Sequence, residues 1–230
     1  MDILAIGCEY SGTTTLLQRL QEWMLENFGQ HTIIHDHFKL PHASGHPPID
    51  PPGIILTSEE KAQVMAMTPK VKEIFTRYAL YYHTPSELGK EGEIGSIRGG
   101  HHIDDLIYGP HYFGYGGPEE PGDRRVEAQL IEQRLNDYAP NTVLVLLKAS
   151  PATIRRRMKD DPHESSLIQD EDIEFLLGRF EEEFHRSSIL NKFALDTTES
   201  TPKLTFQQFL VEMEPHWSEA DRLRMLTKDA

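Results

Sequence analysis

The start of the chain constrains its fold more than any other part. Residues 2–6, DILAI, form a short apolar run that ends at Gly7, as a buried strand of a parallel sheet does. From Thr13 on, apolar residues recur at the spacing of one helix face until Gly29 stops the run. A buried strand, a glycine-containing loop and an amphipathic helix in this order are typical of an α/β protein.

The rest of the chain continues this alternation. Four more strands are predicted, at 32–38, 93–97, 142–149 and 192–196. Helices are predicted from Ser58 on and over 69–83, 123–138, 151–160, 170–186 and 201–214. The segment 99–122 is rich in glycine and aromatic residues and is interpreted as a functional loop with a short helix. The expected fold class is α/β, with a parallel sheet of about five strands and helices on both faces. Without repeats or low-complexity linkers, residues 1–230 are expected to form a single domain.

Composition excludes several classes of protein. The formal net charge is −14, so an unaided nucleic-acid-binding surface is not expected. The one cysteine, Cys8, cannot form an internal disulfide and favours a reducing compartment. No apolar run approaches the roughly 20 residues that a membrane-spanning helix needs. We therefore expect a soluble, cytoplasmic protein with neither a nucleic-acid nor a membrane partner.

The loop between the first strand and the first helix carries the most specific pattern. Its glycines, Gly7 and Gly12, fit the phosphate-binding Walker A pattern G-x-x-x-x-G-K-[ST], but Thr13 stands where the pattern has lysine. In such a loop the backbone N–H groups and the helix N-terminus bind an anion. The Thr14 hydroxyl is expected to coordinate Mg²⁺, and Thr15 to hydrogen-bond a phosphate oxygen. The alternative interpretation is an ordinary glycine turn.

The sequence GCEYSGTTTL resembles the GxxxSGKTTL loop of P-loop nucleoside and nucleotide kinases, the group around thymidylate kinase and the deoxynucleoside kinases. Later segments that fit the same family are HHIDDLIYG, VLVLLKASPATIRRRM and FALDTT. The resemblance implies a three-layer P-loop NTPase fold with a helical lid at about 151–170 and ATP and Mg²⁺ as cofactors, and it is compatible with a homodimer. It also implies that the nucleotide contacts residues of the loop: Gly7, Ser11, Gly12, Thr13, Thr14 and Thr15.

Thr13 is the main departure from that family. The loop lysine normally sets a fixed positive charge against the β- and γ-phosphates, whereas a threonine donates one neutral hydrogen bond. Charge-assisted hydrogen bonds are about twice as strong as neutral ones. Either another cation supplies the charge, or turnover is weak or absent.

Acidic residues at strand ends are the next candidates. Asp36 follows the second predicted strand, and in the resembling kinases a carboxylate there meets the acceptor hydroxyl and acts as base. Asp104 and Asp105 are interpreted as a magnesium ligand and an acceptor-orienting group, respectively. The family pattern often has arginine directly after this carboxylate, but here Leu106 follows. A capping role for Asp36 and a solvated loop pair remain the alternatives.

Two further segments complete the expected site. Arg155, Arg156 and Arg157 are consecutive, so on a helix they point about 100° apart, and at most one or two can face a phosphate. In the resembling kinases such lid arginines close over the transferred phosphoryl group, with Arg155 and Arg156 taken as the catalytic pair. The alternative is a solvated helix face. Asp196 and Thr197 stand where similar kinases hold adenine.

Three functions remain open from the sequence. The first is ATP-dependent phosphoryl transfer to a nucleoside, nucleotide or similar small acceptor through the variant loop. The second is a regulatory or scaffolding nucleotide-binding protein with weak or no turnover. The third is a metal-dependent hydrolase built on histidines and aspartates, since His35, His37, His42 and His46 lie close together in the sequence. No Cys or H-E-x-x-H partner supports that metal site, and these histidines are interpreted as surface and pocket residues.

Overall fold

The computed structural model describes residues 1–29, 32–36, 38–41, 56–86, 96–163 and 166–227. Its centre is a parallel sheet of five strands in the order β2-β3-β1-β4-β5. The strands are β1 (Asp2–Ile6), β2 (Ile34–His35), β3 (Ile97–Gly99), β4 (Thr142–Lys148) and β5 (Asn191–Asp196). β1 lies in the middle, paired with β3 on one side and β4 on the other.

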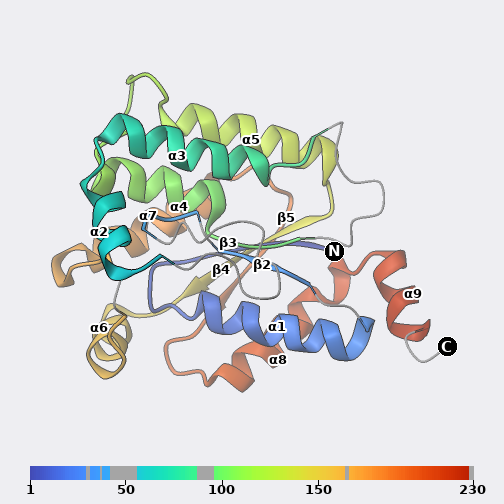
Figure 1. The fold of residues 1–230 in the computed structure, drawn as a ribbon. Coiled ribbons are helices and arrows are strands. Elements are labelled where there is room, and N and C mark those ends of the chain that lie inside the picture. The colour runs from blue at the N-terminus through green and yellow to red at the C-terminus, as the bar shows by residue number, and fades with distance from the viewer. Residues whose placement is uncertain (30–31, 37, 42–55, 87–95, 164–165, 228–230) are drawn as a thin grey trace.

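Helices cover both faces of this sheet, giving three layers (Figure 1). Successive strand residues point to opposite faces. Leu4 and Ile6 belong to the core under α4 (His101–Tyr108), α5 (Arg124–Tyr138) and α7 (Ile173–Arg186). Ile3 and Ala5 belong to the core under α1 (Thr13–Phe28) and α8 (Pro202–Met213). The expected α/β fold with a sheet of about five strands is therefore confirmed.

Most helix boundaries follow local capping chemistry. α1 starts after Gly12 and ends at Gly29, both in the left-handed region. α2 (Ser58–Ala66) has a capping box between Thr57 and Glu60, and α3 (Pro69–Tyr82) begins at a proline. The Asp123 side chain caps α5, as expected. The remaining elements are α6 (Pro151–Asp160), a 3₁₀ turn over Asp170–Asp172, a 3₁₀ turn over Glu214–His216, and α9 (Glu219–Thr227).

Two predicted strand boundaries were wrong. Among the described residues of the expected 32–38, only Ile34–His35 form β2, because only these pair with β3. β3 is Ile97–Gly99, so it overlaps the expected 93–97 only at Ile97 and extends beyond it; residues 93–95 lie outside the described part. The segment 99–122, interpreted as a functional loop with a short helix, contains the short helix α4 and also a π-helix over Gly109–Phe113. α9 was not predicted, because its hydrophobic pattern is weak.

No helix in the described part of the chain combines the length and the apolar character needed to cross a membrane.

Candidate phosphate-binding site

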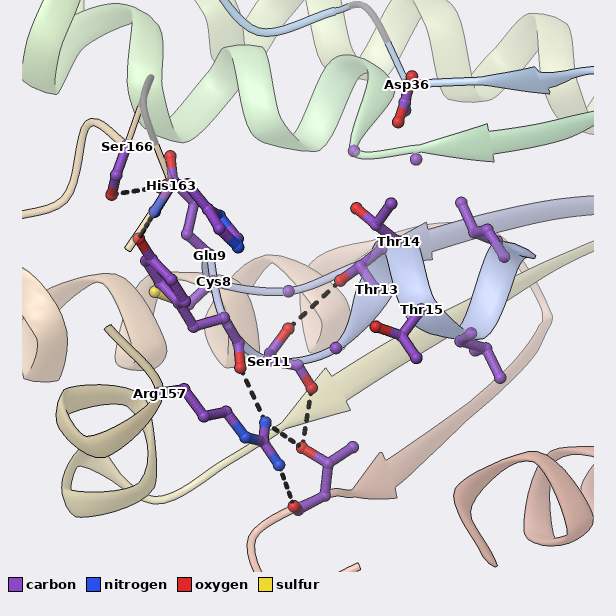
Figure 2. Close-up of a pocket in the computed structure, with 18 of the residues that line it drawn as sticks. Cys8, Glu9, Ser11, Thr13, Thr14, Thr15, Asp36, Arg157, His163 and Ser166 are labelled. Atoms are coloured by element: carbon purple, nitrogen blue, oxygen red, sulfur yellow. Dashed lines mark hydrogen bonds between the residues drawn. The ribbon is translucent and has the colours of Figure 1, made fainter. Parts of the chain in front are cut away.

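A large pocket opens at the carboxyl ends of the central strands, where ligands bind in open parallel sheets. Its volume is about 1100 Å³. The loop after β1 forms one wall, the ends of β2 and β3 with α4 form another, and α6 with the following loop closes a third. Figure 2 shows the loop side chains with Asp36, Arg157, His163 and Ser166 around this pocket.

The loop backbone depends on its glycines. Gly12 has φ 101°, which a residue with a Cβ rarely adopts. Gly7 lies so close to its surroundings that an added Cβ would stand 2.4 Å from Ser11 Oγ and 2.7 Å from the Leu147 carbonyl oxygen. Tyr10 has φ 65° although it is not glycine, so the loop stores backbone strain of the kind found at ligand sites.

The N-terminus of α1 faces the pocket without a side-chain cap. Its N-cap residue is Gly12, which has no side chain to accept hydrogen bonds from the first turn. The first N–H groups of a helix have no intrahelical partner. Thr13, Thr14 and Thr15 line the pocket at this end, and the Thr13 hydroxyl lies 3.2 Å from Ser11 Oγ. Unpaired donors and the positive end of the helix dipole therefore suit an anionic group here.

Arg157, on α6, holds the loop after β1 through its backbone. Its guanidinium donates to the carbonyl oxygen of Tyr10 at 2.8 Å and to the carbonyl oxygen of Thr197 at 2.6 Å. It also donates to the hydroxyl of Thr197, at 3.1 Å, and that hydroxyl contacts the Ser11 carbonyl oxygen at 2.8 Å. Arg157 and Thr197 thus bind the loop backbone to α6 and to the end of β5 (Figure 2).

The loop that follows α6 rests on the phosphate loop as well. The ring of His163 stacks on Tyr10 with centroids 4.2 Å apart, and the His163 N–H donates to the Tyr10 hydroxyl at 2.9 Å. Ser166 Oγ donates to Glu9 at 2.7 Å. Glu9 and Tyr10 of the loop after β1 therefore contact Ser166 and His163 beside the pocket (Figure 2).

Glu9 also forms an ion pair with Lys39, which follows β2. Burial raises the pKa of Glu9, but the Lys39 charge and the hydrogen bonds from Lys39, Ser166 and Leu167 outweigh burial and lower it. A cation thus lies beside the loop although Thr13 removes the usual one. Sequence reasoning missed Lys39; its only local signal is a basic residue three positions after Asp36.

Asp36 and Asp104 both line the pocket. Asp36 is exposed and lies across the pocket from Thr14 (Figure 2). Asp36 packs closely against Gly99, where an added Cβ would lie only 3.2 Å from the Asp36 Cβ. Burial, with the negative charges of Glu9 and Asp105, raises the pKa of Asp104 to about 7 against the opposing effect of Lys39.

Asp105 does not join them, which corrects the sequence-based assignment. Its carboxylate is buried in an ion pair with Arg124, 2.6 Å from Nε, and accepts a 2.6 Å hydrogen bond from Tyr115. It does not line the pocket. Adjacent helix residues point about 100° apart, so when Asp104 faces the pocket, Asp105 faces the packing between α3, α4 and α5.

The consecutive arginines of α6 also point in different directions. Arg155 points outward and pairs with Asp170 and Glu174 at 2.7 and 2.9 Å. It was expected at the phosphate site and does not lie there. Arg156 is exposed and lines the pocket. Asp196 is also exposed and borders a separate hollow of about 880 Å³. Thr197 lines the main pocket, but its hydroxyl is engaged with the loop backbone and Arg157.

The described part of the chain contains no group of three or more His, Cys, Asp or Glu residues that could hold a metal ion. The ring of His35 lies tilted against that of His83, with centroids 4.3 Å apart. His37, His42 and His46 lie outside the described residues. The metal-dependent hydrolase is therefore not favoured.

Comparisons with known proteins agree on the fold. No protein-family model and no curated protein matches the chain. The structure of deoxyadenosine kinase from M. mycoides with bound dATP matches at 15% identity and a TM-score of 0.57, over 93% of this chain and 99% of that one. The YorR protein from Bacillus subtilis, in complex with phosphorylated GDP, matches at 15% identity and a TM-score of 0.53, over 94% and 99%. The chain therefore has the three-layer fold of P-loop kinases.

Proposed function

We propose that this chain binds ATP with its phosphates on the loop of residues 7–14 and transfers the γ-phosphoryl group to a nucleoside, nucleotide or similar small acceptor. The observation that carries the proposal is the uncapped N-terminus of α1, which meets the glycine loop inside a pocket that also holds Asp36. Within residues 1–230, taken as one domain, α6 and the loop after it, about 151–170, act as the lid.

Each named residue has a role in this proposal. Asp36 takes the proton of the acceptor hydroxyl as its oxygen bonds to the γ-phosphorus and the bond to the bridging oxygen of ADP breaks. Arg156 approaches the transferred group from the lid, and Thr15 bonds a phosphate oxygen. We assign adenine to the end of β5, near Asp196 and Thr197.

Thr14 and Asp104 would hold Mg²⁺ in this arrangement. Both line the pocket and offer oxygen ligands, which Mg²⁺ prefers, and phosphate oxygens and water would complete its coordination. A bound Mg²⁺ would neutralise charge on the β- and γ-phosphates. A carboxyl group with a pKa of about 7 is partly protonated at neutral pH, so metal binding would favour its ionised form.

Titration with a non-hydrolysable ATP analogue tests the binding step. We expect saturable binding that is lost in Gly7→Val, because the added side chain meets Ser11 and the β4 backbone. Gly178→Ala is the matched control, since a Cβ there meets nothing within 4 Å. Wild-type protein that fails to bind the analogue would contradict the proposal.

A turnover assay then separates an enzyme from a binding protein. ATP with Mg²⁺ and a panel of nucleosides and nucleoside monophosphates should yield ADP and a phosphorylated acceptor. Analogue binding without turnover on any acceptor would instead favour the regulatory or scaffolding function, for which Thr13 is the argument.

We also propose a homodimer formed through α3. This helix exposes an apolar stripe of Val71, Ile74, Phe75, Tyr78 and Tyr82, with Tyr78 76% exposed. Lys70 is the one charged residue among its exposed positions, and antiparallel pairing sets the two Lys70 side chains at opposite ends. A chain of net charge −14 can therefore meet its copy here without opposing like charges. Light scattering should give a dimer mass that Phe75→Glu with Tyr78→Glu reduces to a monomer mass.

A further inference from the structure

The phosphate loop lacks its lysine, yet a lysine from elsewhere in the chain reaches it. We propose that Lys39, carried by the segment after β2, contacts the nucleotide phosphates in place of the loop lysine. This inference rests on the proposed ATP binding and assigns to that site a residue outside the loop pattern.

The backbone around Lys39 is held in place by its neighbours. Phe38 and Leu40, on either side, are 2% and 1% exposed, so both are fixed in the core. Lys39 between them is directed to the pocket, which its side chain lines with 15% exposure. Its position therefore does not depend on a long side chain searching through solvent, and little side-chain entropy is lost when it binds.

The ammonium group lies beside the first residues of the loop. It pairs with Glu9, two residues after Gly7, and lies 5.2 Å from the centroid of the Tyr108 ring. Its charge also reaches Cys8. Burial and the charge of Glu9 raise the pKa of the Cys8 thiol to about 12, while the Lys39 charge opposes the rise. Lys39 thus places positive charge next to the loop backbone that faces the anion site.

The pairing with Glu9 leaves Lys39 able to bind a second anion. An ammonium group has three donors, so it can hold Glu9 and a phosphate oxygen together. Glu9 is not dependent on Lys39 alone, because Ser166 Oγ and the Leu167 N–H donate to it at 2.7 and 3.3 Å.

The lid arginines are less well placed for this contact. The Arg157 guanidinium is engaged with Tyr10 and Thr197, and Arg155 pairs outside the pocket. Arg156 lines the pocket but belongs to the lid helix, and no described side chain orients it toward the loop. Lys39 is the cation that the described structure holds against a side chain of the loop itself.

The test compares binding of a non-hydrolysable ATP analogue to four proteins: wild type, Lys39→Met, Glu9→Gln and the double variant. A direct contact predicts that Lys39→Met weakens binding by about 10- to 100-fold, the size of a lost charge-assisted contact. The double variant should stay within about threefold of Lys39→Met. Arg19→Met removes one charge from an exposed position of α1 outside the pocket and should change binding by less than about twofold, since surface charges are screened.

Recovery of wild-type affinity in the double variant would overturn the inference, because Lys39 would then only neutralise Glu9. Adding Thr13→Lys to Lys39→Met should restore binding. If Thr13→Lys instead restores binding to Arg156→Met and not to Lys39→Met, the phosphate contact belongs to Arg156. If Lys39→Met does not fold, Lys39→Gln keeps a hydrogen-bond donor without the charge. A wild-type protein that binds no ATP analogue would overturn the proposed function together with this inference.

Discussion

The guanidinium of Arg157 donates a 2.8 Å hydrogen bond to the carbonyl oxygen of Tyr10, 147 residues earlier in the chain. Together with its bonds to Thr197, this contact makes Arg157 a support for the loop rather than a ligand of the phosphoryl group. Tyr10 needs such support because its positive φ is strained. α6 and the loop after β1 are therefore coupled through the loop backbone.

Arg157→Met should loosen the loop. We expect ATP-analogue binding to weaken by roughly 10-fold, the size of one lost charge-assisted hydrogen bond, with faster amide exchange over residues 8–14. Arg157→Lys should not restore binding, because a lysine ammonium group lacks the rigid planar fork of donors with which the guanidinium reaches its acceptors. Arg155→Met is the control, since Arg155 pairs outside the pocket. Equal exchange rates in Arg157→Met and Arg155→Met would show that the contact does not support the loop.

Asp105→Asn should destabilise the fold. The change leaves the Arg124 charge buried without its closest partner, and breaking a buried ion pair costs about 3–5 kcal/mol. Urea unfolding measures the loss. The double variant Asp105→Leu with Arg124→Met should lose less, because no unpaired charge remains. An Asp105→Asn protein of normal stability but reduced turnover would return Asp105 to a catalytic role.

Some parts of the candidate site could be predicted from the sequence, and others could not. The loop 7–15 was predictable because strand, glycines and helix follow one another locally. Asp104 and Asp105 were not separable, because their directions depend on α4, whose sequence HHIDDLIY also suits a loop after glycines. The roles of Arg157 and Lys39 depend on contacts with Tyr10 and Glu9 that join distant segments. Such contacts leave no periodic signal in the sequence.

A buried hydrogen-bond chain links His101, His102 and Glu132. His101 faces the Leu80 carbonyl oxygen at 3.2 Å, so its Nε2 carries the proton, and burial holds the pKa of His101 well below its usual range. Its neutral Nδ1 therefore accepts from His102 Nδ1 at 3.1 Å. His102 Nε2 faces a carboxylate oxygen of Glu132 at 3.3 Å.

The hydrogen bonds of Glu132 in this buried cluster predict that the protein loses stability in acid. Burial raises the pKa of Glu132, but the hydrogen bond and charge of His102, together with hydrogen bonds from Ser187 and Ser188, outweigh burial and lower the pKa from 4.5 to about 2. The stabilising effect is therefore complete above about pH 4.5 and is lost as the pH falls toward 2, with an upper size of roughly 3 kcal/mol. Urea unfolding should show Glu132→Gln well below wild type at pH 6, with a smaller gap at pH 3. Exposed Glu212→Gln should show no gap at either pH, and a pH-independent gap for Glu132→Gln would exclude this linkage.

Asp36→Asn should separate chemistry from binding. Asp36 is exposed to the pocket and faces Thr14, so the amide keeps the shape but cannot take a proton. Turnover should fall by roughly 10²-fold or more, as for loss of a general base, while the Kd for ATP changes by less than about threefold. Asp104→Asn is the matched comparison. If Asp104 acts through Mg²⁺, excess Mg²⁺ should restore part of the activity of Asp104→Asn and none of that of Asp36→Asn. Full turnover in a folded Asp36→Asn protein would make Asp36 a structural residue, and the search for the base would then move to Asp104.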